Sequence, residues 1–144
     1  GAFSIALACD ILYAAEDARL WPNFMNIGVP PELGSLQTLA AIVGPSKAKE
    51  IFYTAEKISG KDGEKLGIVN KTFPAEELAS AVYALAERIS EQSAAPVQIT
   101  KATINAISYP STNALFAAEM QNTAICTMSE ESRALLMANF LKKK

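Results

Sequence analysis

Two consecutive prolines, Pro30 and Pro31, interrupt the chain between the glycines Gly28 and Gly34. Each proline ring fixes φ at about −65° and removes a backbone N–H, so this stretch cannot lie inside a helix or a central strand. The segment GVPPELGS is therefore expected to form a stiff, extended corner. The apolar residues after it recur at helical spacing, which predicts a helix over residues 33–43.

The acid of this corner is Glu32, and its residue pattern leaves two interpretations open. Beside the apolar residues Val29 and Leu33, the carboxylate would lose part of its hydration, which is how a carboxyl group becomes a proton carrier near neutral pH. Alternatively, Glu32 only favours the first turn of the next helix, where an acid suits the positive end of the helix dipole.

Composition excludes several classes of function. The 144 residues, half of them apolar, suffice for one ordinary domain, and the net charge of −2 without a basic stripe argues against a nucleic-acid partner. No apolar run is long enough to cross a membrane. Histidine is absent, which excludes Ser-His and Cys-His dyads and His-based zinc sites, so acid–base chemistry must come from other groups.

The two cysteines, Cys9 and Cys126, lie far apart on apolar stretches. We expect both to be buried free thiols, as is typical of a reducing, intracellular compartment, and their spacing indicates no metal site.

Periodicity and turn residues predict a small mixed α/β region followed by a helical half. We expect a buried helix over 2–9 that Asp10 ends, and N-caps at Ser111 and Ser129. The expected strands are 11–15, 18–21 and 68–73, and the expected helices are 33–43, 45–56, 60–66, 75–92, 96–108, 111–127 and 129–141. The abrupt apolar opening after Gly1, without a methionine, is interpreted as the start of a piece of a longer chain.

Three blocks in the right order resemble the crotonase superfamily of enoyl-CoA hydratases and isomerases. GAFSIALACDILYAAEDARL resembles the middle of the family pattern, where a glycine-rich turn leads into a buried helix, an Asp and two strands. KAKEIFYTAEKISGKDGEKLGIVNKTFPAEEL resembles the next block, and TMSEESRALLMANFLKKK resembles the closing helix. The resemblance implies a crotonase-like α/β (β-β-α spiral) fold, with residues 1–74 in the C-terminal part of its core and 75–144 as a helical oligomerisation region.

The chemistry implied by this resemblance is that of acyl-CoA thioesters. Two backbone N–H groups stabilise an enolate, and such preorganised donors supply several kcal/mol. One donor falls on Gly1, and the other belongs to the family's N-terminal half, which is missing here. Hydratases of the family use two glutamates, whose positions correspond to Ser4 and Phe24 in this chain. The usual hydratase mechanism is therefore not supported.

The stretch from Leu20 to Glu32 instead resembles the peroxisomal type of Δ3,Δ2-enoyl-CoA isomerase, with Glu32 at the position of its catalytic acid. One carboxylate suffices for that reaction, because the same group takes a proton from C2 and returns it at C4. Two residues depart from the pattern. Pro30 and Leu33 replace more usual residues, and Leu33 stands where this type prefers glycine.

The resemblance also suggests substrate contacts and partners. Trp21 and Phe24 would line an acyl pocket or belong to the core, and Phe140 would lie near the coenzyme A or simply pack. Lys142–Lys144 would meet phosphates or stabilise their own helix end. No cofactor is expected beyond the coenzyme A of the substrate, and the family forms homotrimers or dimers of trimers.

Two other functions remain open from the sequence. The first is a non-catalytic crotonase-like module that binds acyl-CoA or assembles proteins. The second is a dehalogenase-like enzyme with a nucleophilic carboxylate in place of Glu32, which is disfavoured because that enzyme needs a histidine.

Overall fold

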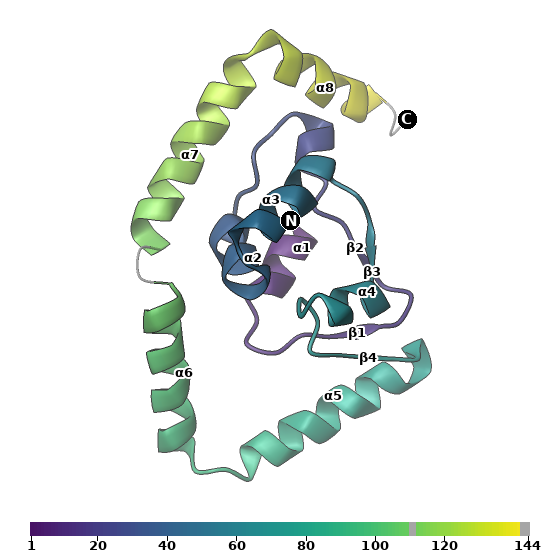
Figure 1. The fold of residues 1–144 in the computed structure, drawn as a ribbon, viewed down its shortest axis with the longest axis vertical. Coiled ribbons are helices and arrows are strands. Elements are labelled where there is room, and N and C mark those ends of the chain that lie inside the picture. Colours follow the sequence, from purple (N-terminus) through teal and green to yellow (C-terminus); the bar gives the residue numbers. More distant parts are fainter. Residues whose placement is uncertain (110–111, 142–144) are drawn as a thin grey trace.

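Of the residues that the computed structural model describes, 1–109 and 112–141, the first half forms short elements and the second half forms four long helices (Figure 1). The short elements are α1 (Ala2–Leu7), β1 (Tyr13–Ala15), β2 (Arg19–Leu20), the 3-10 turn η1 (Met25–Ile27), α2 (Ser35–Val43), α3 (Pro45–Thr54), β3 (Ile58–Ser59), α4 (Gly60–Lys65) and β4 (Lys71–Phe73). The long helices are α5 (Ala75–Ser90), α6 (Ala94–Ser108), α7 (Thr112–Met128) and α8 (Glu130–Leu141).

Two small sheets in the described part of the chain join segments that are distant in sequence. Strand β1 pairs in parallel with β4, placing Tyr13 opposite Lys71, and β2 pairs antiparallel with β3. A parallel pair requires a long crossover, and here it contains α2, α3 and α4. Gly60 begins α4 so close to β1 that an added Cβ would lie 2.0 Å from the carbonyl oxygen of Ala15. Only glycine fits this approach.

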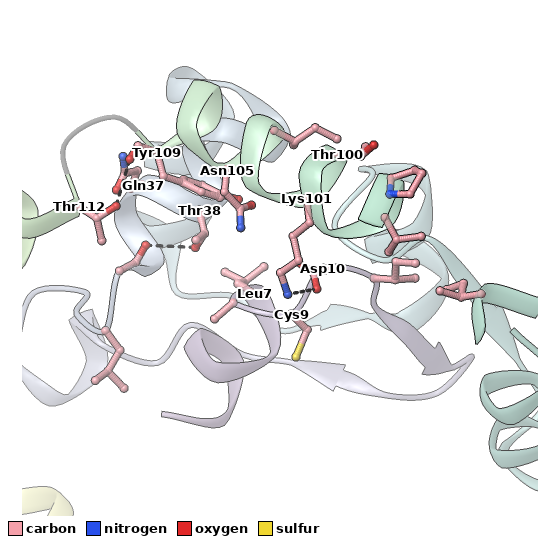
Figure 2. A pocket seen from close by; sticks show the side chains of 18 of the residues that line it. Leu7, Cys9, Asp10, Gln37, Thr38, Thr100, Lys101, Asn105, Tyr109 and Thr112 are labelled. Carbon is pink, nitrogen blue, oxygen red and sulfur yellow. Dashed lines mark hydrogen bonds and ion pairs between the residues drawn. The ribbon is translucent and has the colours of Figure 1, made fainter. Parts of the chain in front are cut away.

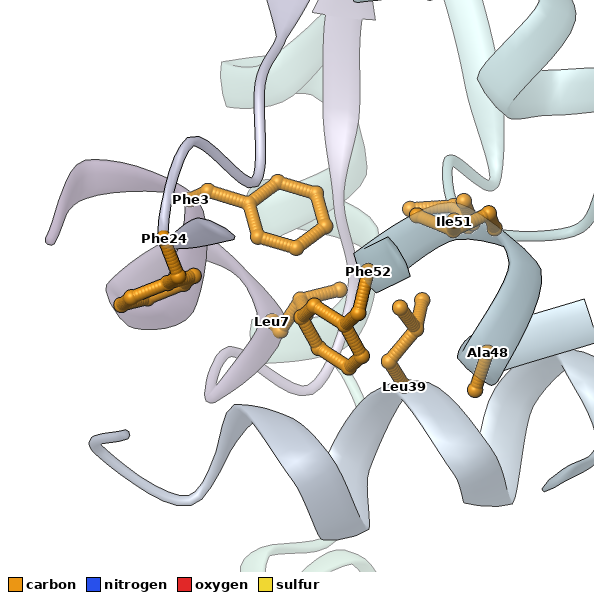
Figure 3. Packing of buried hydrophobic residues seen from close by; sticks show 8 residues of the cluster. Phe3, Leu7, Phe24, Leu39, Ala48, Ile51 and Phe52 are labelled. Atoms are coloured by element: carbon orange, nitrogen blue, oxygen red, sulfur yellow. The ribbon is translucent and has the colours of Figure 1, made fainter. Parts of the chain in front are cut away.

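The hydrophobic core lies between α1, α2 and α3 (Figure 3). The rings of Phe24 and Phe52 meet edge to face with 6.4 Å between their centroids, and Leu39 of α2 is fully buried beside them. Burying one such side chain contributes about 1.5–3 kcal/mol, so this cluster fixes the three helices relative to one another. Its buried members are Phe3, Leu7, Phe24, Leu39, Ala48, Ile51, Phe52 and Ile68.

Capping residues set several helix boundaries where the sequence predicts them. The side chain of Ser59 accepts a hydrogen bond from the backbone N–H of Asp62 at 3.1 Å, and Pro45 occupies the first turn of α3. The Ser129 hydroxyl accepts from the N–H three residues later at 3.2 Å. The predicted N-cap Ser111 lies outside the described residues.

Helices α5 to α8 run around the first half of the chain as an outer frame (Figure 1). Helix α5 lies against β1 and β4, and α8 lies against η1, where the Asn139 side chain donates to the Asn26 carbonyl at 3.2 Å. Neither α5 nor α6 contains a buried residue. The apolar residues that recur at helical spacing in the predicted helix 75–92 are therefore only partly covered, since Val82 and Ile89 remain exposed. None of the described helices is long and apolar enough to cross a membrane.

The strands are shorter than the sequence suggests. Strand β3 was not predicted, because two residues carry no usable alternation. The strand expected over 68–73 contains only β4, because the N–H groups of Ile68 and Val69 bond to the Gly63 carbonyl in a turn after α4, at 2.9 and 3.1 Å.

The end of α1 also differs from expectation. The helix stops at Leu7, so Cys9 is exposed rather than buried, while Cys126 on α7 is half-buried; both thiols are free. Asp10 does not cap α1. It pairs instead with Lys101 of α6, with 2.5 Å between Oδ2 and Nζ.

Candidate active site

The corner before α2 combines rigid and left-handed residues. After η1 the chain passes Gly28, whose φ is 74°, and then the Pro30-Pro31 pair. It reaches α2 through Leu33 and Gly34, whose φ angles are 60° and 73°. A left-handed conformation costs a residue with a side chain about 1–2 kcal/mol, so Leu33 carries backbone strain at this point. Glycine, which the resemblance implies at this position, would adopt this conformation without that strain.

Ser35 stabilises the corner from its C-terminal side by hydrogen bonds to Glu32. Its hydroxyl donates to the backbone carbonyl of Glu32 at 2.8 Å, and its N–H approaches the same oxygen at 3.3 Å. Ser35 is fully buried at the start of α2. These bonds fix the main chain of Glu32 while its side chain stays free to act.

The Glu32 side chain is half-buried. Its carboxylate makes no hydrogen bond or ion pair to any residue in the ranges 1–109 and 112–141. A carboxylate without a protein partner on a fixed backbone is available to take up and return a proton.

Gly1 caps the N-terminus of α1, which packs against α2. The first bond of the helix runs from the N–H of Ile5 to the Gly1 carbonyl at 3.0 Å, and no side chain caps the helix. The N–H groups of residues 2–4 therefore have no partner within the helix. Such a helix end attracts an anionic oxygen. Gly1 is exposed, and nothing lies within 4 Å of a Cβ placed on it.

The aromatic residues named from the sequence have separate places. Phe24 is buried in the core against Phe52, whereas Trp21 is partly exposed. The Trp21 indole N–H donates to the Ala55 carbonyl at 2.9 Å, and the Lys57 ammonium lies 4.5 Å from the ring centroid. The side chain of Phe140 and the residues Lys142–Lys144 lie outside what the structure describes.

A large, mostly apolar cavity of about 910 Å³ lies between the C-terminal end of α1, the start of α2 and helix α6 (Figure 2). Leu33 and Gly34 line it, so it reaches the corner, but Glu32, Trp21 and Phe24 are not among its lining residues. In Figure 2 the Asp10–Lys101 ion pair bridges the loop after α1 and helix α6 along this cavity.

A second carboxylate at the corner was missed by the sequence analysis. Glu119 of α7 is only 5% exposed, and its Oε2 accepts a hydrogen bond from the backbone N–H of Gly34 at 3.1 Å. The two residues are separated by 85 positions, and Glu119 follows two alanines in a helix with apolar residues on several sides. No local signal marks it as a contact of the corner.

Comparison with known proteins gives the family. The profile described as enoyl-CoA hydratase/isomerase matches residues 1–144. The chain belongs to the enoyl-CoA hydratase/isomerase family.

Relatives and solved structures of this family agree with the fold. The chain is 29% identical to a crotonyl-CoA hydratase of Syntrophomonas wolfei, over all of this chain and 55% of the relative. It is 37% identical over 105 residues to a peroxisomal Delta(3,5)-Delta(2,4)-dienoyl-CoA isomerase of Arabidopsis thaliana, covering 72% of this chain and 38% of the relative. A crystal structure of an enoyl-CoA hydratase from Mycobacterium avium subsp. paratuberculosis K-10 superimposes with a TM-score of 0.91 and 27% identity, over 99% of this chain and 57% of that chain.

These matches confirm the crotonase-like α/β fold and its helical C-terminal region. The chain spans a little over half the length of the first two relatives. The names of the enoyl-CoA hydratase/isomerase relatives include both hydratases and an isomerase, so family membership does not choose between the two reactions.

Proposed function

We propose that this protein is an enoyl-CoA isomerase that moves a double bond from C3 to C2 of an acyl-CoA in fatty-acid β-oxidation. Glu32 would remove a proton from C2, the thioester oxygen would take the negative charge of the enolate, and Glu32 would return the proton at C4. Atoms and charge balance without water or an oxidant. The substrate supplies the coenzyme A, and no further cofactor takes part.

One observation carries the proposal: the carboxylate of Glu32 has no partner among the described residues, although its backbone is fixed by Ser35. A reaction with one proton carrier needs no acid–base group other than this carboxylate. The two positions where hydratases of the family place acids hold Ser4 and Phe24, both buried. Neither side chain can act as a carboxylate base, which favours isomerisation over addition of water.

The N-terminus of α1 is proposed as part of the oxyanion hole. The backbone N–H of Gly1 and the unpaired N–H groups after it would face the thioester oxygen. Trp21, Phe24 and Phe140 remain proposed substrate contacts. For Phe24 that contact would be made by the edge of a ring that also packs in the core.

The test compares wild type with Glu32→Gln on a 3-enoyl-CoA, using the protein in its full natural length. Formation of the conjugated 2-enoyl-CoA and of 3-hydroxyacyl-CoA is measured separately, which distinguishes isomerisation from hydration. We expect the conjugated product and a loss of at least about 100-fold in kcat on Glu32→Gln, as for removal of an acid–base group.

Glu56→Gln is the matched control, because Glu56 is an exposed acid two residues after the end of α3. It should leave turnover unchanged. Turnover that survives Glu32→Gln removes Glu32 from the mechanism. Binding of acyl-CoA without any turnover would favour the alternative, a non-catalytic crotonase-like module for acyl-CoA binding or assembly.

We also propose that residues 75–144 form the oligomerisation region and residues 1–74 the part of the core that carries the site. The proposed assembly is a homotrimer or a dimer of trimers. It is supported by large apolar side chains that α7 and α8 expose in the described chain, namely Phe116, Met120, Ile125, Met128, Leu135, Met137 and Leu141. An intracellular, reducing location remains a prediction from the free cysteines.

A further inference from the structure

The buried carboxyl group of Glu119 has no role in the proposed proton transfer, yet it contacts the corner that carries Glu32. Its Oε2 accepts from the Gly34 N–H, while its Oε1 has no partner within residues 1–109 and 112–141. A buried charge-bearing group is costly unless hydrogen bonds satisfy it. The single bond to Gly34 therefore matters to both partners.

The backbone N–H of Gly34 in turn needs a hydrogen-bond acceptor. It is the N-cap of α2, and no side chain of its own helix caps that end. Because Leu33 and Gly34 are both left-handed, the backbone turns sharply here and the Gly34 N–H is directed to α7 instead of a neighbouring carbonyl. Helix α7 adds a second contact, since the Phe116 ring lies 3.5 Å from the place where a Gly34 Cβ would be.

The other end of the same loop is held by α8. Gly28 approaches α8 so closely that an added Cβ would lie 2.9 Å from the Ser132 Cα and 3.1 Å from the Leu135 Cβ. Just before it, Asn139 donates to the Asn26 carbonyl. The loop 28–34 is thus anchored at one end by α8 and at the other by α7, with Glu32 between the two anchors.

We propose that Glu119 is a positioning residue for Glu32: its carboxyl group holds the Gly34 N–H and so fixes the left-handed corner that presents the Glu32 carboxylate. The C-terminal helices would then contribute to the site itself. The catalytic meaning of this role rests on the proposed isomerase function, whereas the positioning itself is measured without substrate.

The test uses amide hydrogen exchange and the carboxyl carbon shift of Glu32, both measured by NMR on the 144-residue chain. In wild type, the Gly34 N–H should exchange at least 10-fold more slowly than that of Leu33, which has no acceptor among the described residues. Glu119→Met removes the acceptor but keeps an apolar side chain of similar length, so the buried site stays filled. We expect Gly34 exchange to become at least 10-fold faster and the Glu32 carboxyl shift to change.

Two controls separate positioning from general stability. Glu119→Gln keeps a carbonyl acceptor at the same place and should restore Gly34 exchange to within about 3-fold of wild type. Gln121→Met makes the same change at an exposed position of α7 and should alter neither readout. The Phe52 amide in the core should keep its protection in every variant, since the effect is local.

Several outcomes overturn the proposal. Equal exchange of Gly34 and Leu33 in wild type does so without any variant, and so does an unchanged Glu32 shift in Glu119→Met. In the full-length protein of the Glu32→Gln test, with 3-enoyl-CoA as substrate, Glu119→Met should lower kcat at least 10-fold with KM within 3-fold of wild type. If wild type shows no turnover, the isomerase function fails, and the exchange data still decide the positioning role.

Discussion

Leu33 and Gly34 form a consecutive pair of left-handed residues, with φ angles of 60° and 73°, between the acid of the corner and the first turn of α2. Only one member of the pair is a glycine, the residue that adopts this conformation at little cost. Strain at Leu33 is therefore built into the segment that carries the proposed catalytic group.

Replacement of Leu33 tests this strain. Leu33→Gly and Leu33→Ala remove nearly the same side chain, which is 54% exposed, but only glycine relaxes a φ of 60°. We expect the free energy of unfolding of Leu33→Gly to exceed that of Leu33→Ala by about 1 kcal/mol, from urea denaturation. This is the reverse of their order inside a helix. Equal stabilities, or a more stable Leu33→Ala, would contradict a strained Leu33.

The effect of close packing between Gly28 and α8 can be separated from that of a left-handed backbone by comparing two glycines of nearly equal φ, Gly28 at 74° and Gly67 at 75°. Nothing lies within 4 Å of a Cβ on Gly67, so Gly67→Ala should cost only about 1–2 kcal/mol for its left-handed backbone. Gly28→Ala should cost about 1–3 kcal/mol more, because the new methyl group overlaps the main chain at Ser132. Chemical denaturation measures both. Equal losses would show that α8 does not pack against this loop.

Glu64 links α4 to β4 and makes stability depend on pH. The Thr72 hydroxyl and then its backbone N–H, at 2.8 Å, donate to Glu64 Oε2, and these bonds lower the pKa of Glu64 from its ordinary value of 4.5. Since the folded-state pKa is the lower one, the stabilisation is present above about pH 4.5 and is lost as the pH falls through the folded-state value.

Between about pH 5 and pH 3, the range in which carboxyl groups titrate, Glu64→Gln should therefore lose less stability than wild type. Thermal midpoints across that range provide the measurement. Glu91→Gln, at an exposed site after α5, serves as the control and should follow the wild-type curve. Parallel curves for wild type and Glu64→Gln would rule out the Glu64–Thr72 contribution.

The ion pair between Asp10 and Lys101 connects the end of α1 to α6 along the cavity. Both side chains are exposed, so a double-mutant cycle with Asp10→Asn and Lys101→Met should give a coupling free energy of about 0.2–1 kcal/mol. High salt should reduce it, because exposed charges are screened. A coupling above about 2 kcal/mol would mean that water is excluded from the pair.

Association of copies should depend on the exposed face of α7. Met128 is 80% exposed and Ile125 is exposed beside it on the same helix. In sedimentation velocity we expect a species heavier than a 15.4 kDa monomer, shifted toward the monomer by Ile125→Glu with Met128→Glu. Tyr53→Glu alters an equally exposed apolar residue on α3 and should leave the assembly intact. A monomeric wild type at micromolar concentration would refute the proposed oligomer.

The elements that sequence reasoning located best are those with local signals. Pro45 and the Ser59 cap set the starts of α3 and α4, and the apolar period of residues 75–92 gave α5, because each of these signals acts within one turn of helix. The short strands carried less information. Strand β3 exists only because it pairs with β2, a partner that no local pattern reveals.

The residues of the candidate site likewise divide into those with a local sequence signal and those without one. The Pro-Pro corner and Glu32 were visible in the sequence, and the resemblance marked Leu33 as unusual before its φ was known. Glu119 was not visible, because the described hydrogen-bond partner of its side chain lies 85 residues away and an acid among alanines usually faces water. The expected burial of Cys9 was wrong, since α1 ends two residues earlier than predicted and leaves Cys9 exposed in the loop after it.

The chain has one tryptophan, and its indole N–H is bonded to the carbonyl of Ala55 at the end of α3 while a lysine covers the ring. Emission from Trp21 consequently serves as an intrinsic optical probe of whether that helix end is docked. Opening of this region can be followed in the unlabelled protein, separately from probes placed in the frame helices.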